Sequence, residues 1–441
     1  MKKIIASVLS VILAIGMTAC GGGNTSVTEE AFGTEGTKEL AACGTVSDKA
    51  EDITVTGDPT AIKVGAILIG DENEGYTYAH IDGIKKACAA IGIAESQIIW
   101  KYSIGEDQVC QDSAEELVSK GCNVIFSNSY GHQTFMQKVA EKNPNVTFVA
   151  MTGDTAATAN LDNFCNAFTA VYESRYVSGV VAGLKLKELV DNGTLTKETK
   201  PDAFDADGNI KIGYVGAFPY AEVVSGYTAF YLGVKSVMSN VVMSVSYTNS
   251  WFDIAKEGAA AEQLMASGCV IISQHADSTG APAAVQAASK NGTLCFSVGY
   301  NISMLEVAPD VALVSAGNNW QAYYEYALKT VVNGGKVAKN WAAGYANGAV
   351  KVTELGSAAA AGTAEKVADV ENAIKNGTLH VFDTNTFTVG GKKITWAYAT
   401  DTNGNFVYDA NNVVADGYYH ESYTQSAPSF TLRIDGITEL S

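Results

Sequence analysis

Short apolar runs alternate with longer helical stretches along the chain, and this alternation restricts the fold to a few architectures. The clearest run, residues 63–70, reads Lys-Val-Gly-Ala-Ile-Leu-Ile-Gly. A nearly continuous apolar run of this kind is typical of a parallel strand that is buried on both faces. Strands that alternate with helices predict an α/β fold with a doubly wound parallel sheet. The first set of predicted elements comprises strands 63–70, 97–102, 122–127 and 146–151 and helices 77–91, 109–119 and 132–142.

The same alternation starts again near residue 172. The second set comprises helices 172–190, 221–238, 253–267 and 282–290 and strands 210–216, 241–247, 270–274 and 293–298. Two similar lobes in one chain predict a ligand cleft between them, lined by the loops at the carboxyl ends of the strands. The expected segments are an N-terminal lobe (61–168 and 299–335), a C-terminal lobe (169–298 and 336–382) and a small β-rich C-terminal extension (383–441).

The first twenty residues are typical of a secretory signal. Lys2 and Lys3 precede an apolar run at residues 4–17, which is shorter than the roughly 20 residues that a membrane-spanning helix needs. The Met-Thr-Ala-Cys sequence that ends at Cys20 resembles a bacterial lipobox, in which the cysteine becomes the lipid-carrying N-terminus. The alternative is an ordinary export signal with a coincidental cysteine. The lipobox predicts a lipid anchor at Cys20, a flexible tether over residues 21–60, and a protein held on the outer face of the cell membrane by lipid alone.

Composition excludes several classes of function. The 29 Lys and Arg against 47 Asp and Glu give a formal net charge of −18, and cleavage after residue 19 would take this to −20 by removing Lys2 and Lys3. A nucleic-acid-binding protein needs clustered basic residues, and the sequence has no such cluster. With 47% hydrophobic and 17% charged residues, the chain is too apolar for disorder and too interrupted for a polytopic membrane protein. We therefore expect a soluble, extracytoplasmic body.

The cysteine pattern and the lack of known catalytic motifs give no sign of a metal site, a cofactor or catalysis. Seven cysteines follow Cys20 without any Cys-x-x-Cys pair, and they stand at positions 43, 88, 110, 122, 165, 269 and 295. Whether any of them pair stays open, although no disulfide framework is expected. The sequence contains no nucleophile elbow, zinc-protease motif or phosphate-binding glycine loop. We expect no enzyme activity, no metal and no cofactor.

Aromatic and polar side chains recur where the predicted strands end. Such a combination is typical of a pocket for a planar ligand, because rings stack on its faces while amides and carboxylates bind its edge. A single aromatic at such a position more often serves packing, but the recurrence favours a site. The candidate ligand-binding residues are Asp71, Tyr76, Tyr78, Asn128, Tyr130, Phe218, Asn249, Trp251, His275, Asp277, Tyr300 and Trp320.

Several of these segments together resemble the basic membrane protein family of substrate-binding lipoproteins, the purine-nucleoside receptors that feed ABC importers. The resemblance runs from about residue 63 to residue 382. Its most specific motifs are Gly-Tyr-Thr-Tyr-Ala-His at 75–80, Ala-Phe-Pro at 217–219 with Glu-Val at 222–223, Asn-Ser-Trp-Phe-Asp at 249–253, Gln-His-x-Asp-Ser at 274–278, and Asn-Trp at 319–320 before Tyr-Tyr at 323–324. The resemblance implies a type I periplasmic-binding-protein fold, a monomer that closes on a purine, and a permease as partner. Carried over by position, Tyr76 and Trp251 would hold the base between them.

The sequence departs from the nucleoside-binding pattern at two positions. Where nucleoside receptors carry an Asp for the ribose hydroxyls, this chain has Tyr300 and Asn301, and where they carry a Lys it has Asn318. These departures favour a free purine base, or another flat heterocycle, over a nucleoside. The alternatives are another small solute such as a sugar, or a lipoprotein that presents its bound solute to a membrane sensor.

Overall fold

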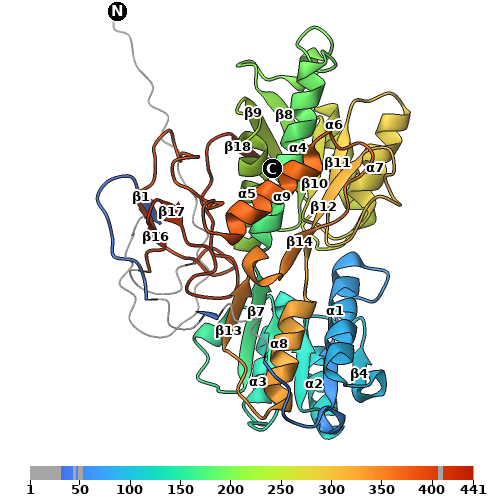
Figure 1. Ribbon diagram of the computed structural model, residues 1–441, viewed down its shortest axis with the longest axis vertical. Coiled ribbons are helices and arrows are strands. Elements are labelled where there is room, and N and C mark those ends of the chain that lie inside the picture. Colours follow the sequence, from blue (N-terminus) through green and yellow to red (C-terminus); the bar gives the residue numbers. More distant parts are fainter. Residues whose placement is uncertain (1–30, 43–45, 48–52, 406–410, 441) are drawn as a thin grey trace, which may run out of the picture. The chain divides into compact units, whose positions relative to one another are not determined.

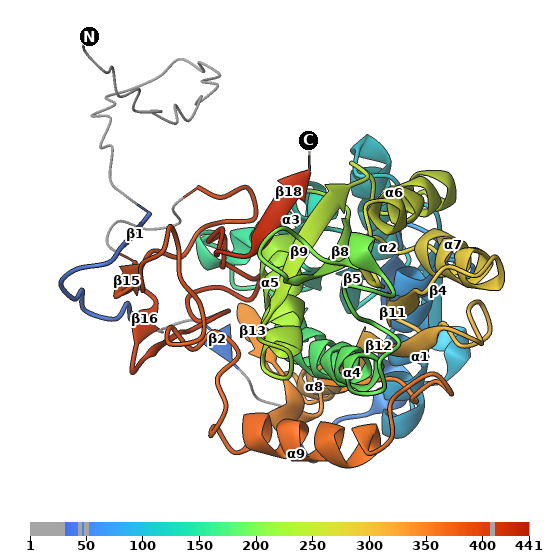
Figure 2. The same cartoon turned by 90° about the horizontal axis from the view of Figure 1, so that it is seen from above.

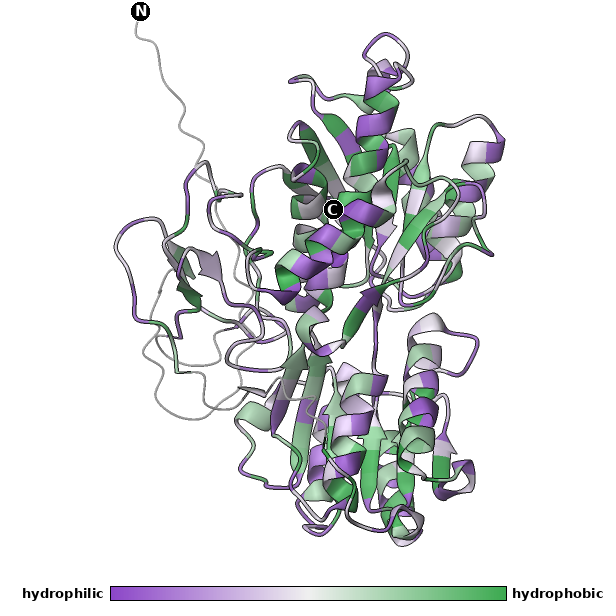
Figure 3. Ribbon diagram, viewed as in Figure 1, coloured by the Kyte–Doolittle hydropathy of each residue, from purple (hydrophilic) through white to green (hydrophobic). Residues whose placement is uncertain are grey.

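The computed structural model describes residues 31–42, 46–47, 53–405 and 411–440, so the predicted signal and Cys20 lie outside the described residues. Two seven-stranded sheets, each flanked by helices, form two lobes within residues 32–440 (Figure 1). Hydrophobic residues are concentrated on the strands at the centre of each lobe (Figure 3). Among the described residues, no helix is both long enough and apolar enough to cross a membrane.

The N-terminal lobe is built on a sheet whose strands are all parallel. Its strand order is β2 (Val46–Ser47), β13 (Asn340–Ala343), β7 (Phe164–Thr169), β6 (Thr147–Met151), β5 (Val124–Ser127), β3 (Val64–Ile67) and β4 (Ile98–Lys101). Its helices are α1 (Gly75–Ile91), α2 (Gln108–Ser119), α3 (Gln133–Ala140) and α8 (Gln321–Val332). Short 3-10 helices are η1 (Pro59–Ala61), η2 (Glu95–Gln97), η3 (Tyr130–His132) and η4 (Thr155–Ala157).

The C-terminal lobe repeats this plan, with one antiparallel strand at an edge. Its strand order is β14 (Val350–Val352), β12 (Ala312–Asn318), β11 (Phe296–Tyr300), β10 (Ile271–Gln274), β8 (Ile210–Gly216), β9 (Val241–Tyr247) and β18 (Ile437–Leu440), of which β14 is antiparallel to β12. Its helices are α4 (Val171–Asp191), α5 (Ala221–Lys235), α6 (Ile254–Ala266), α7 (Gly280–Lys290) and α9 (Thr363–Lys375). The remaining 3-10 helices are η5 (Pro201–Ala203) and η6 (Tyr345–Asn347).

The chain crosses between the two sheets three times, and these crossovers correct the expected lobe boundaries. The crossovers connect β7 to α4, β12 to α8, and β13 to β14. Residues 299–318, expected in the N-terminal lobe, belong to the C-terminal sheet because β12 pairs in parallel with β11. Residues 340–343, expected in the C-terminal lobe, pair with β7 in the N-terminal sheet. A buried strand has the same apolar pattern in either sheet, so pattern alone could not assign these two.

The segments outside the lobes also differ from expectation. Within the expected tether, β1 (Phe32–Gly33) pairs antiparallel with β15 (Trp396–Ala397), and β2 pairs with β13. The C-terminal extension, which we call the tail, has less strand than the predicted β-rich segment: besides β15, its described residues form only the short strands β16 (Val414–Ala415), β17 (Tyr418–Tyr419) and β18. Figures 1 and 2 both show β1 and β16 grouped on one side of the lobes, and Figure 2 shows β15 between them. Side-chain hydrogen bonds, such as those of Asn412 to residues 38 and 414, replace much of the strand pairing that the pattern suggested.

Candidate ligand-binding site

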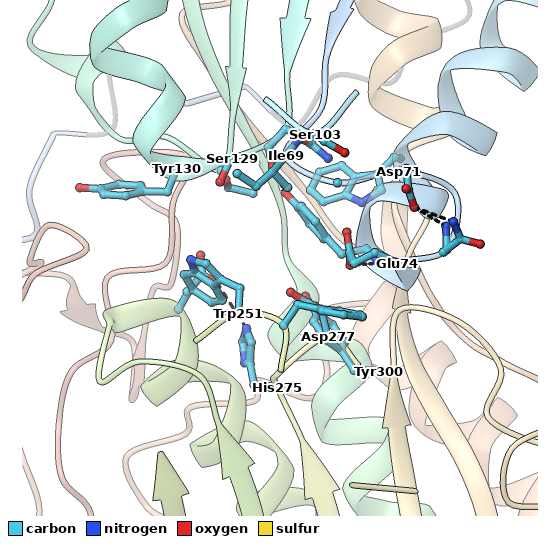
Figure 4. Close-up of a pocket in the computed structure, with 18 of the residues that line it drawn as sticks. Ile69, Asp71, Glu74, Ser103, Ser129, Tyr130, Trp251, His275, Asp277 and Tyr300 are labelled. Carbon is cyan, nitrogen blue, oxygen red and sulfur yellow. Dashed lines mark hydrogen bonds and ion pairs between the residues drawn. The ribbon is translucent and has the colours of Figure 1, made fainter. Parts of the chain in front are cut away.

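A cavity of about 350 Å³ lies between the two lobes, at the carboxyl ends of their strands. In Figure 4, Ser129, Ile69 and Asp71 face Trp251, His275 and Tyr300 across it. The described residues that line it are Ile69, Gly70, Asp71, Asn73, Glu74, Tyr76, Ser103, Asn128, Ser129, Tyr130, Thr152, Phe168, Glu222, Trp251, Phe252, His275, Asp277, Tyr300 and Trp320. They include many aromatic rings and four carboxyl groups but neither Lys nor Arg.

Tyr76 is held in the N-terminal wall by the start of α1. The Glu74 carboxylate caps the helix by accepting from the Tyr76 N–H at 2.7 Å and the Thr77 N–H at 2.8 Å. The Tyr76 hydroxyl donates to the Asn128 carbonyl oxygen at 2.5 Å. The Asn128 side-chain oxygen accepts from the Ile69 N–H, and its amide nitrogen donates to the Thr77 hydroxyl. These bonds hold the loop after β3 and the start of α1 together. The Tyr76 ring is therefore fixed at both ends.

Trp320 forms the deep end of the same wall. His80 stacks on it, with ring centroids 4.3 Å apart and planes at 22°. The indole is buried, and its Nε1–H has no hydrogen-bond partner among the described residues. A buried, unpaired donor is costly, so a ligand atom that accepts from this N–H would gain affinity.

Trp251 presents the opposite wall, on the loop between β9 and α6. Its backbone carbonyl accepts from the Asp277 N–H at 2.8 Å, which joins this loop to the one after β10. The Phe218 ring meets the Trp251 ring edge to face at 5.1 Å, and Phe218 in turn stacks on Tyr220. Phe218 therefore supports Trp251 from outside the cavity.

The carboxyl groups of the C-terminal wall are deeply buried. Burial raises the pKa of Glu222 to about 8, against the opposing effect of the Arg175 guanidinium. Burial, and then the nearby Glu74 carboxylate, raise the pKa of Asp277 well above its usual range. Burial also lowers the pKa of His275, whose Nε2 lies 3.4 Å from Glu222 Oε1. The His275–Glu222 contact is therefore between two neutral groups at pH 7.

Arg175 lies behind this wall and is completely buried. Its guanidinium carbon is 3.6 Å from the centroid of the Tyr300 ring, and its Nη1–H donates to the Gln274 carbonyl oxygen. Its Nε and Nη2 atoms have no hydrogen-bond partner among the described residues. The positive charge of Arg175 therefore lies behind the carboxyl groups of this wall, and Arg175 itself does not line the cavity.

The positions that depart from the nucleoside pattern are occupied by internal hydrogen bonds. The Asn301 amide donates to Asp277 Oδ1 at 2.7 Å. The Asn318 amide donates towards Tyr300 and Asn301, and its oxygen accepts from the Thr169 hydroxyl. These side chains connect two crossovers to the wall of the cavity.

The cavity brings together most of the residues predicted from the sequence. Those that line it are Asp71, Tyr76, Asn128, Tyr130, Trp251, His275, Asp277, Tyr300 and Trp320. Three do not: Tyr78 is 47% exposed on the outer side of α1, Phe218 lies behind Trp251, and Asn249 is exposed with φ 52°. On a helix that begins at Gly75, Tyr76 and Tyr78 point to different sides, so both could not face one cavity.

Sequence reasoning missed several lining residues. Ser103 and Thr152 follow strands β4 and β6, and the strand-end rule could have found them. Glu222 stands in the first turn of α5, within a motif that was noted but not selected. No sequence signal marked Phe168, because it lies inside the buried strand β7.

Comparisons with known proteins agree with this architecture. The family model of PnrA-like ABC transporter substrate-binding proteins matches residues 68–385. A purine-binding protein from Brucella abortus is 32% identical over 323 residues, which cover 73% of this chain and 83% of that protein. A putative ABC transporter glucose-binding protein from Haloferax volcanii is 29% identical over 386 residues, which cover 85% of this chain and 89% of that protein.

Solved structures show the same fold at low sequence identity. An ABC transporter solute-binding protein from Aeropyrum pernix superposes with a TM-score of 0.60 at 16% identity, over 73% of this chain and 93% of the other. A transcriptional activator of the comK gene from Bacillus halodurans gives 0.56 at 19% identity, over 71% and 98%. The two-lobed fold of type I periplasmic-binding proteins is thereby confirmed. This chain belongs to the family of PnrA-like substrate-binding proteins of ABC transporters.

Proposed function

We propose that the protein captures a purine, with the free base preferred, in the cavity between its lobes and delivers it to an ABC permease. The observation that carries this proposal is that aromatic rings from both lobes, Tyr76 and Trp251 among them, line one cavity without a single Lys or Arg. Aromatic rings on two sides of a cavity can stack on both faces of a flat heterocycle. The lack of basic side chains disfavours phosphorylated ligands, whose charge the acidic lining would repel.

The polar groups at the cavity suit the edges of a purine. Trp320 lines the cavity, and a ligand that reaches its buried, unpaired indole N–H gains a donor for a ring nitrogen or an exocyclic oxygen. The Glu222 carboxyl, with its pKa near 8, is protonated at pH 7 and offers a donor and an acceptor side by side. A purine also presents a donor beside an acceptor on one edge, so the two can pair through two hydrogen bonds.

The preference for a base over a nucleoside rests on Asn301 and Asn318. Their amides are engaged with Asp277, Tyr300 and Thr169 rather than free for sugar hydroxyls. A ribose would have to displace these bonds. The relative named as a purine-binding protein supports a purine ligand, while a Lactococcus lactis relative, 26% identical over 38% of this chain, is named as a nucleoside-binding protein.

A sugar is the second candidate, because the Haloferax volcanii relative is named as a glucose-binding protein. Carboxylates accept from sugar hydroxyls and aromatic rings pack on sugar faces, so the lining does not exclude it. Glucose therefore belongs in every titration beside the purines.

Closure of the lobes would couple binding to delivery. A ligand that touches both Tyr76 and Trp251 favours the closed arrangement, since only differential contact can shift the equilibrium between open and closed states. We propose that a lipid on Cys20 anchors the protein on the outer face of the membrane beside its permease. A membrane sensor as the receiving partner stays the alternative, and co-purification with a permease or a sensor distinguishes the two.

Calorimetric titration of refolded, ligand-free protein tests the proposal. We expect heat with adenine, guanine or hypoxanthine, weaker binding of their nucleosides, no binding of nucleotides, and recovery of the ligand unchanged. Mass spectrometry of the ligand that copurifies with the protein gives an independent identification. Heat with glucose alone would replace the purine proposal by the sugar one.

Replacing Trp251 with alanine should weaken purine binding strongly, because base stacking on an aromatic ring is worth roughly 1–3 kcal/mol. This corresponds to a rise in Kd of roughly 5- to 150-fold, measured by the same titration. Tyr78→Ala is the matched control, since Tyr78 belongs to the same sequence motif as Tyr76 but lies outside the cavity. Equal effects of the two substitutions would place the ligand elsewhere.

A further inference from the structure

A second cavity, of about 440 Å³, lies where the tail meets the crossovers between the lobes. Its wall combines the start of α4, the end of β13, residues 374–382 and residues 418–423 of the tail. The tail residues lie beyond residue 385, where the family match ends. This cavity is therefore a feature that the tail adds to the family fold.

Glu173 places the cavity at the hinge. It stands in the first turn of α4, directly after the crossover from β7. Its Oε2 accepts from the Tyr345 N–H at 2.6 Å, and Tyr345 lies in the crossover between β13 and β14. Glu173 follows the first crossover directly, and Ala342 lies in β13 just before the third, so a molecule that contacts both lies beside two of the three connections between the lobes.

Two carboxyl groups, those of Glu173 and Glu421, line the cavity, with neither Lys nor Arg among its described lining residues. Burial raises the pKa of Glu173 and of Glu421 to about 7, in each case against backbone N–H donors that favour the charged form. Tyr172 lies close to both carboxyl groups. Ionised carboxylates without a cationic partner are unfavourable in such a site, and a bound cation would relieve this.

Aromatic rings stand beside these carboxyl groups. His380, Tyr418 and His420 form a continuous stack, with centroid separations of 3.7 Å and 3.8 Å. Two polar atoms of the lining, His420 Nε2 and Ser422 Oγ, are buried without a hydrogen-bond partner among the described residues. Ser422 also has φ 54°, a left-handed conformation that is uncommon for serine.

An organic cation fits this lining better than a metal ion. Among the described residues, no group of three or more His, Cys, Asp or Glu side chains is arranged to hold a metal. Carboxylates beside aromatic rings are instead the usual surroundings of amidinium, guanidinium or ammonium groups.

We propose that the cavity formed by Glu173, Glu421 and the His380–Tyr418–His420 stack is a second ligand site, which binds a small planar organic cation at the hinge. Its occupant contacts the elements that adjoin two crossovers, α4 and β13, so it acts as an effector of purine binding in the cleft. The site rests on its own observations and does not depend on the identity of the ligand between the lobes.

Benzamidine, with benzamide as its neutral analogue and benzoate as its anionic one, tests the charge preference. Titrations at pH 8, where the carboxyl groups are ionised, use the Trp251→Ala protein so that binding in the cleft is weakened. We expect benzamidine to bind at least tenfold more tightly than benzamide, and benzoate not to bind. Equal affinity for the amidine and the amide, or no binding of the amidine, would overturn the proposal.

Substitutions then locate the site. Glu173→Gln keeps an oxygen for the Tyr345 N–H but removes the charge, and should weaken benzamidine at least tenfold. Glu365→Gln, an exposed position on α9 outside the cavity, is the matched control and should have no effect. Tyr418→Leu, which breaks the ring stack at a half-buried position, should also weaken binding and serves if Glu173→Gln does not fold. Equal affinities in all these variants would show that benzamidine binds elsewhere.

The affinity of the cleft for the purine tests the effector role separately from the second site. In the wild-type protein, the Kd of the purine should change in the presence of saturating benzamidine and should not change in Glu173→Gln. An unchanged purine Kd in the wild type would overturn the effector role. Failure of all purines to bind would contradict the proposed function, whereas the benzamidine titration would still report on the second site.

Discussion

Buried ionisable side chains concentrate around the cleft. Glu222, Asp277 and His275 are all held towards their neutral forms by burial, while Arg175 alone carries its charge in the interior behind them. A group that is neutral only because it is buried opposes folding once the pH favours its charge. The stability of the empty protein should therefore depend on pH.

Glu222 gives the sharpest prediction of this kind. Its pKa is raised in the folded protein from the ordinary 4.5 to about 8. The stabilising contribution is therefore fully present below pH 4.5 and is lost as the pH rises through 8, at up to ~1.4 kcal/mol per pH unit. Glu222→Gln mimics the protonated form, so its melting temperature should fall less between pH 5 and pH 8 than that of the wild type.

Thermal melts of ligand-free protein across this pH range provide the measurement. The surface substitution Glu262→Gln is the control and should follow the wild-type curve, since Glu262 is exposed on α6. Parallel curves for Glu222→Gln and wild type would mean that Glu222 is ionised in the folded protein at neutral pH.

At the scale of elements, helices α4 and α5 approach each other closely through glycines. A Cβ at Gly179 would lie 2.1 Å from the Phe230 carbonyl oxygen. A Cβ at Gly233 would lie at the same distance, 2.1 Å, from the Tyr176 carbonyl oxygen. The clash is with the backbone of the facing helix, which cannot rotate away as a side chain can. The long helix α4, which follows the first crossover, is thus fixed in the C-terminal lobe.

Gly179→Ala should consequently destabilise the protein by more than ~2 kcal/mol, although alanine is the better helix former by ~1 kcal/mol. Gly258→Ala in α6 is the matched control, because a Cβ there would lie 3.6 Å from the Gly280 carbonyl oxygen, an ordinary van der Waals contact. Chemical denaturation should show a loss for Gly179→Ala and a small gain for Gly258→Ala. Similar effects at the two positions would contradict the close approach of α4 and α5.

At the scale of the whole described chain, the tail connects both lobes. The Thr402 N–H donates to Asp154 Oδ2 in the N-terminal lobe at 3.1 Å, and its carbonyl accepts from the Ala221 N–H at the start of α5. Asp154 also accepts from the hydroxyl of Tyr130, which lines the cleft. Further along, β18 completes the edge of the C-terminal sheet beside β9. Opening of the lobes must therefore strain or break the Thr402 contacts.

Asp154→Ala removes the acceptor of the Thr402 N–H and should loosen the part of the tail around Thr402, while Ser426 keeps its own hydrogen bonds to Gly153 and Asn340 in the N-terminal lobe. Amide hydrogen exchange should become faster at residues 398–405 and stay unchanged in β18, which pairs with β9 in the C-terminal sheet. Asp162→Ala, on the surface of the same lobe, is the control and should leave both segments unaffected. Unchanged exchange at residues 398–405 in Asp154→Ala would show that other contacts hold the tail.

The alternation of strands and helices could be predicted from the sequence, because apolar residues form continuous runs in buried strands and recur every three to four positions in amphipathic helices. The strands β3, β5, β8 and β9 and the helices α1, α4 and α6 lie within a few residues of their predicted bounds. The structure of the tail could not be predicted in this way, because its backbone is held by side chains such as Glu421, which accepts from the N–H groups of Ser422, Ser429 and Phe430. Contacts of this kind do not recur at a regular spacing along the sequence.

For the candidate site, position at a strand end was a good guide to which loop reaches the cleft and a poor guide to which side chain does. Tyr78, Phe218 and Asn249 stand in the right loops but point elsewhere, whereas Glu222 and Phe168 reach the cavity from a helix and a strand. The direction of a side chain depends on the local backbone and on its neighbours, which strand-end position does not specify.

The sequence by itself therefore determined the α/β class, the two lobes and the aromatic, acidic character of the cleft, because these follow from local patterns of apolar and polar residues. Only the tertiary structure decided which sheet receives β12 and β13, which side chains meet across the cleft, and how the tail adds a second cavity at the hinge. These features depend on contacts between residues far apart in the chain, and such contacts are selected by packing rather than by local pattern.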